Sequence, residues 1–121
     1  MISQSITLAA SAARTATANF EPAAQNRYAN GLVVYINVTA IVSTPSVVFT
    51  IQGYDEASDT WYDILSSAAV TGIGATRLRV HPSLAASANA AANDFLPRRW
   101  RVRAVHADAD SITYSIGAVQ R

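Results

Sequence analysis

The sequence predicts a single all-β domain, an antiparallel β-sandwich of jelly-roll type with seven to eight strands and an extended N-terminal arm. Three observations predict this fold class. Short runs of β-branched and aromatic residues alternate with polar residues, and turn-forming residues separate the runs at roughly regular spacing. The chain of 121 residues has room for one hydrophobic core. It contains no cysteine, so packing must hold that core.

Residues 1–30 are rich in Ala, Ser, Thr and Asn and carry few large apolar side chains, among them Ile6, Leu8 and Phe20. Two interpretations remain open for this segment. It is an extended arm that lies across a neighbouring subunit, or it forms weak edge strands. We therefore divide the chain into this segment and one β-sandwich domain over residues 31–121. Removing residues 1–20 is expected to leave that domain folded.

The stretch from Gly31 to Asp55 contains two alternating runs separated by Ser-Thr-Pro-Ser at residues 43–46. This pattern predicts an antiparallel strand pair at the centre of the core. A second hairpin is predicted over residues 53–65, with a polar tip at residues 55–59. That tip has several acids but lacks the central Gly and the distal Glu of a calcium-binding EF-hand loop.

A further strand is predicted at residues 75–81, after the turn Gly72-Ile73-Gly74. Residues 83–94 are expected to be a loose crossover with a short helical turn, capped by Ser83. Residues 99–106 and 112–118 predict a closing hairpin around the turn at 108–110.

The predicted core consists of the side chains that share the apolar face of each strand. They are Val34, Ile36, Val38, Phe49, Ile51, Leu78, Val80, Trp100, Val102, Ile112, Tyr114 and Ile116.

The chain has few charges, since only 14% of its residues are Asp, Glu, Lys or Arg. A surface so poor in charge favours contact with other protein, and copies of the same chain in a homo-oligomer are one such partner. The net charge of +1 argues against a dedicated nucleic-acid binder. No apolar run reaches the ~18 residues of a membrane span. The first 13 residues also lack the basic and apolar regions of a secretory signal.

The candidate interface of the predicted domain is built on arginine, and all nine basic residues are Arg. Arg77 and Arg79 alternate on one predicted strand, and Arg99, Arg101 and Arg103 alternate on another. If both strands lie in one sheet, the five guanidinium groups form a stripe that pairs with carboxylates of a protein partner. The alternative is a solvated face with local ion pairs. Ile6, Leu8 and Phe20 of the arm complete the candidate interface.

No catalytic, metal-binding or cofactor-binding set is predicted. His106, Asp108 and Asp110 share one face of an extended chain, but no second histidine cluster or nucleophile elbow accompanies them. Turn contacts within the chain are the simpler interpretation of the two Asp residues. The sequence therefore predicts a protein that is not an enzyme.

A resemblance to a known family rests on two segments of the chain and one strand between them. The segments are FTIQGYDEASDTWYDIL (49–65) and LPRRWRVRAVHADADSITYSIGA (96–118), and the strand contributes Leu78, Arg79, Val80 and Pro82. With these residues the chain resembles the small β-rich structural proteins of tailed bacteriophage virions. The resemblance covers residues 31–118 and transfers no individual functional residue.

The resemblance implies a capsid decoration (cement) protein that binds the major capsid protein and its own copies. It implies a location on the virion, at the capsid surface, and in the host cytoplasm during assembly. Tail, head–tail adaptor and fibre-base roles stay open. A further alternative is a carbohydrate-binding β-sandwich for host attachment, which requires exposed aromatics on one sheet face; Tyr35, Tyr54 and Tyr62 are the candidates.

Overall fold

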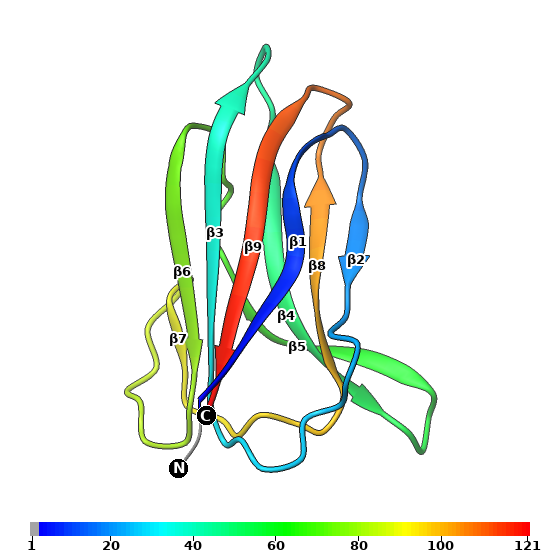
Figure 1. Cartoon of the computed structure of the whole chain (residues 1–121), viewed down its shortest axis with the longest axis vertical. Coiled ribbons are helices and arrows are strands. Elements are labelled where there is room, and N and C mark those ends of the chain that lie inside the picture. Colours follow the sequence, from blue (N-terminus) through cyan, green and yellow to red (C-terminus); the bar gives the residue numbers. More distant parts are fainter. Residues whose placement is uncertain (1–2) are drawn as a thin grey trace.

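The computed structural model describes residues 3–121, which form a two-layer β-sandwich without any helix (Figure 1). The predicted all-β sandwich is therefore confirmed. With no helix among them, the described residues offer no helical membrane span. The strands are β1 (Gln4–Arg14), β2 (Ala18–Phe20), β3 (Leu32–Ile41), β4 (Val47–Asp55), β5 (Thr60–Ser66), β6 (Gly74–Val80), β7 (Ala91–Ala92), β8 (Trp100–His106) and β9 (Ile112–Gln120).

The strands form two sheets, and in one of them the first and the last described strands are neighbours. The first, sheet A, has the order β1-β9-β3-β6-β7, and the second, sheet B, has the order β2-β8-β4-β5. All neighbours are antiparallel except β6 and β7. The chain changes sheet at every connection apart from β4–β5 and β6–β7, so β9 at the end of the chain lies between β1 and β3.

Two of the three predicted hairpins are wrong. β3 and β4 lie in opposite sheets, as do β8 and β9, whereas β4 and β5 do form the predicted hairpin. The turns at residues 42–46 and 107–111 carry the chain across the sandwich instead of back beside itself. Alternation cannot distinguish the two cases, because a strand turns its apolar side chains to the same core whether its successor lies beside it or opposite it.

The core lies between the sheets and contains all twelve predicted side chains, each at most 1% exposed. Trp100, Tyr114 and Phe49 are the largest of them, and the rings of Phe49 and Tyr114 meet edge to face with centroids 5.1 Å apart. Every buried side-chain nitrogen or oxygen among the described residues has a hydrogen-bond partner. The core is thus both apolar and free of polar defects.

The N-terminal segment forms edge strands of its own domain. β1 pairs with β9 from Gln4 opposite Gln120 to Arg14 opposite Ile112, and β2 pairs with β8. Ile6, Leu8 and Phe20, assigned from the sequence to an interface, instead pack against the chain's own core. The edge-strand interpretation therefore describes this segment, and an arm across a neighbouring subunit does not.

The crossover between β6 and β8 contains no helical turn. Residues 81–90 form turns that return the chain to β7, where Ala91 and Ala92 pair in parallel with Arg79 and Val80. The expected helix is absent from this described segment, because its small side chains offer no apolar face that would fix a helix on the core. This added strand and the short β2 bring the described chain to nine strands.

Candidate functional site

The five candidate arginines do not form one stripe. Arg77 and Arg79 project from β6 in sheet A, whereas Arg101 and Arg103 lie on β8 in sheet B, and Arg99 directly precedes β8. The predicted stripe required both strands in one sheet. Since the sheets are on opposite sides of the core, the stripe is wrong.

The three arginines at β8, which are Arg99, Arg101 and Arg103, form hydrogen bonds with other side chains of the same chain. Arg99 forms an ion pair of 2.7 Å with Glu21, and its guanidinium lies 4.3 Å from the centroid of the Tyr54 ring. The hydrogen bond that Arg99 donates to the Glu21 carboxylate raises the pKa of Arg99 above its ordinary value. Arg103 donates to the side-chain oxygen of Asn19 over 3.2 Å. Local pairing, the alternative left open by the sequence, describes these two side chains.

Arg101 is partly buried and contacts both polar and aromatic side chains. Its Nε donates to Gln52 Oε1 over 2.8 Å, and Gln52 in turn donates to Asp63 over 2.8 Å. Its guanidinium also lies 4.0 Å from the centroid of the Trp61 ring. Partial burial lowers the pKa of Arg101 relative to an exposed arginine. The three guanidinium groups on the outer surface of sheet B therefore have hydrogen-bond partners within the chain.

The outer face of sheet A, in contrast, carries two arginines without an intramolecular partner. Arg77 and Arg79 are exposed and make no side-chain hydrogen bond or ion pair within residues 3–121. Register places Tyr35 between Arg77 and Gly117, and Val33 between Arg79 and Val119. We call these six residues, Val33, Tyr35, Arg77, Arg79, Gly117 and Val119, the sheet A face.

No carboxylate lies on the strands that build the sheet A face. β1, β3, β6, β7 and β9 contain neither Asp nor Glu; the chain's eight acids are on β4 and β5 or in connections. Tyr35 is 50% exposed and Val119 is 40% exposed. The sheet A face thus combines exposed apolar area with two available guanidinium groups, a composition suited to an acidic protein partner.

The three candidate sugar-binding tyrosines do not share a face. Tyr35 belongs to the sheet A face. Tyr54 lies with Trp61 beneath Arg99, and Tyr62 is on the other side of the β4–β5 hairpin, against Gly53. The aromatic platform predicted for a carbohydrate-binding module is therefore wrong for these residues.

The acidic turns are closed by local hydrogen bonds. Asp55 accepts from Ser58 Oγ over 2.6 Å, which lowers the pKa of Asp55. Asp110 Oδ2 accepts from the backbone N–H of Thr44 over 3.2 Å, and the Asp110 N–H donates to Asp108. Over residues 3–121, no group of three His, Asp or Glu side chains is placed to hold a metal ion.

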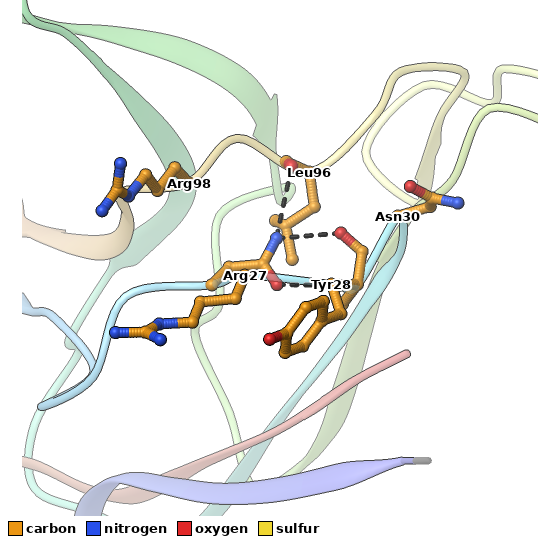
Figure 2. Close-up of a pocket in the computed structure, with 7 residues that line it drawn as sticks. Arg27, Tyr28, Asn30, Leu96 and Arg98 are labelled. Carbon is orange, nitrogen blue, oxygen red and sulfur yellow. Dashed lines mark hydrogen bonds between the residues drawn. The ribbon is translucent and has the colours of Figure 1, made fainter. Parts of the chain in front are cut away.

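A concave surface that the sequence did not predict lies where the β2–β3 connection meets the β7–β8 connection (Figure 2). Its volume is about 590 Å³, and Arg27, Tyr28, Asn30, Leu96 and Arg98 contribute to its lining. The sequence signal was weak, because these loops are far apart in the chain and neither contains a motif. Only the fold brings Arg27 and Arg98 to one cleft.

Comparison with family models, curated proteins and solved structures finds no match to this chain.

Proposed function

We propose that this protein is a virion structural protein of a tailed bacteriophage, a capsid decoration (cement) protein that binds the major capsid protein and its own copies. The proposal starts from the resemblance of residues 31–118. The order β1-β9-β3-β6 facing β2-β8-β4-β5 supports it, because this is the order expected of a jelly roll. Jelly rolls recur in viral capsid proteins and in lectins, so the support is fold-level analogy.

The observation that carries the proposal is the sheet A face. A decoration protein needs a surface that is stable in water yet binds a protein lattice. Arg77 and Arg79 keep this face hydrated, and each guanidinium group can donate two parallel hydrogen bonds to a carboxylate of a partner. Tyr35 supplies the kind of aromatic anchor that dominates protein interfaces. We therefore propose an acidic patch on the major capsid protein as the contact of the sheet A face.

The proposed location is the outer capsid surface in the virion and the host cytoplasm during assembly. Tail, head–tail adaptor and fibre-base roles use the same kind of protein contact, and the particle fraction that contains the protein distinguishes them.

The first test is quantitative mass spectrometry of purified particles, with heads and tails separated. A decoration protein is expected on heads in a fixed ratio to the major capsid protein. Recovery on tails alone would overturn the decoration role in favour of the tail alternatives. Absence from both fractions would overturn the virion proposal.

The second test is rebinding of purified protein to heads that lack it. Arg77→Ser/Arg79→Ser is expected to weaken binding at least about tenfold, since each charged hydrogen bond contributes ~1.5–3 kcal/mol. Arg27→Ser/Arg98→Ser is the matched control, because it removes the same charge from a different surface. Equal weakening by the two double variants would show that bulk charge, not the sheet A face, drives binding.

A further inference from the structure

Three clefts adjoin one another at one end of the sandwich. Both termini of the described chain lie at this end (Figure 1). Their volumes are about 590, 880 and 590 Å³. The first two share the loop from Asn26 to Ala29, and the second and third share Ser3 and Arg121. We call this continuous series the loop-end clefts.

The loop-end clefts concentrate positive charge. Arg27 and Arg98 line the first, Arg27 and Arg121 the second, and Arg79 and Arg121 the third. None of the chain's eight Asp and Glu residues lines any of them. Four of nine arginines and no acid therefore gather here in a protein whose net charge is only +1. Clefts lined by one sign of charge attract ligands of the opposite sign.

The first cleft is rigidly built. Its two loops are joined by backbone hydrogen bonds, from Asn26 N to Arg98 O over 2.8 Å and from Leu96 N to Asn30 O over 3.0 Å. The Asn26 side chain is only 5% exposed. Its Oδ1 accepts from Ala29 N and its Nδ2 donates to Ala29 O, both over 2.9 Å. The backbone of a site fixed in this way loses little conformational entropy when a ligand binds.

Side chains of two kinds project from this rigid frame. In Figure 2, Arg27 and Arg98 extend in the same direction from the two facing loops. Tyr28, the residue after Arg27, is 89% exposed and is the most exposed large hydrophobic side chain described. A guanidinium fork recognises a planar oxyanion, and an exposed aromatic ring offers an apolar face to a flat, partly apolar group.

We propose that the loop-end clefts bind an acidic polysaccharide, whose sugar rings bear carboxylate or sulfate groups. Arg27 and Arg98 would bind the anionic groups, and Tyr28 would stack on a sugar ring. The run of three adjoining clefts suits an extended, repeating chain. A single-stranded nucleic acid fits less well, because base stacking needs successive aromatic platforms. Among the described lining residues the only aromatic side chains are Tyr28 and His81, and they line different clefts. The third cleft shares Val33, Arg79 and Val119 with the sheet A face. Arg27, Tyr28 and Arg98 lie outside that face, so binding at the first cleft does not depend on the proposed virion role.

The test is isothermal titration calorimetry of the full chain with four probes. They are an oligogalacturonate (carboxylate), a chondroitin sulfate oligosaccharide (carboxylate and sulfate), a neutral dextran oligosaccharide and a single-stranded oligonucleotide. Binding of either acidic oligosaccharide, with no binding of dextran, is expected. Chondroitin sulfate binding alone would identify sulfate as the recognised group. Tighter binding of the oligonucleotide, equal binding of dextran, or no binding of both acidic probes would overturn the proposal.

Variants then locate the site. Arg27→Gln/Arg98→Gln is expected to weaken binding of the acidic probe about tenfold or more, and Tyr28→Ala about threefold to tenfold. The control Arg77→Gln/Arg103→Gln removes the same charge outside the clefts and is expected to leave affinity within about twofold. Circular dichroism of each variant checks that it is folded. Equal losses in the two Arg double variants would indicate non-specific charge attraction and contradict the proposal.

Discussion

The indole N–H of Trp100 donates a hydrogen bond of 3.2 Å to the side-chain oxygen of Gln120, and this bond joins the two sheets. Trp100 is fully buried on β8, and Gln120 is 5% exposed on β9. Gln120 also donates to Gln4 on β1 over 2.7 Å. One polar link within an apolar core thus ties the first, the eighth and the last strand together.

Gln120→Leu is expected to lower the free energy of unfolding by about 1–3 kcal/mol, because the buried indole N–H loses its acceptor. Urea denaturation followed by tryptophan fluorescence measures the change. The double variant Trp100→Phe/Gln120→Leu removes the stranded donor as well, so its effect is expected to be smaller than the sum of the two single variants. Strict additivity would contradict the hydrogen bond as the cause.

Phe49→Ala is expected to cost about 3–5 kcal/mol, since it removes a fully buried ring that packs on Tyr114. That loss is comparable to the whole stability of many small domains, so poor folding is expected. Thermal unfolding by circular dichroism checks it, with the exposed Phe95→Ala as the control. An unchanged melting temperature for Phe49→Ala would mean that this face of β4 is not the core.

Deletion of residues 1–20 is expected to unfold the domain, the reverse of the expectation from sequence. The deletion removes β1 and β2, leaves one edge of β9 and one of β8 unpaired, and uncovers the core beneath Ile6, Leu8 and Phe20. Circular dichroism and binding of an apolar dye measure the outcome. A truncated protein with the parent's cooperative transition would restore the picture of a dispensable arm.

Gly53→Ala is expected to destabilise the protein by about 1–3 kcal/mol, through overpacking. An added Cβ would lie 2.6 Å from the Tyr62 ring and 2.9 Å from Pro97. Gly72→Ala is the matched control, since nothing lies within 4 Å of its added Cβ. Combining Gly53→Ala with Tyr62→Ala is expected to recover part of the loss; no recovery would point to the backbone as the origin.

Stability is expected to fall in mild acid because of His106. Burial, and to a lesser degree Arg14, lowers the pKa of His106 below its ordinary value of 6.5, against an opposing effect of Asp108. The folded protein therefore holds the imidazole neutral beside the Tyr114 hydroxyl, 3.1 Å away. The contribution of neutral His106 to the stability of the folded protein is present above pH 6.5. It is lost as the pH falls from 6.5 toward the pKa of His106 in the folded protein. Melting temperatures at pH 7.5 and 5.5 measure it, and His106→Gln is expected to show a smaller difference; an equal difference would exclude His106 as the cause.

The burial of each strand could be predicted from sequence because alternation is a local property. Val34, Ile36 and Val38 occupy every second position, and burying one of them on a strand commits the others to the same side. The pairing of strands is not local. The turn after Ile41 contains Pro45 and resembles a hairpin turn, yet it leads to the opposite sheet.

The pairing of the N-terminal segment and the position of the clefts were harder to predict from the sequence, because they too depend on contacts between distant residues. β1 is rich in Ala and Ser, so its pairing with β9 depends on the backbone ladder and carries little hydrophobic signal. Asn26 contacts the carbonyl of Leu96 across 70 residues of sequence, and nothing in either loop indicates the other. Arg27 and Arg98 therefore became candidates only through the fold.

The position of β9 between β1 and β3 has a consequence for biosynthesis. A ribosome releases β9 after the eight other strands described here, so β1 and β3 must wait with the edges that face β9 unpaired. The N-terminal half cannot form a finished sheet during synthesis, and closure depends on contacts between distant parts of the chain, which are slow to form. The nascent protein is thus most exposed to aggregation just before β9 emerges, and a product truncated before β9 would leave the facing edges of β1 and β3 unpaired.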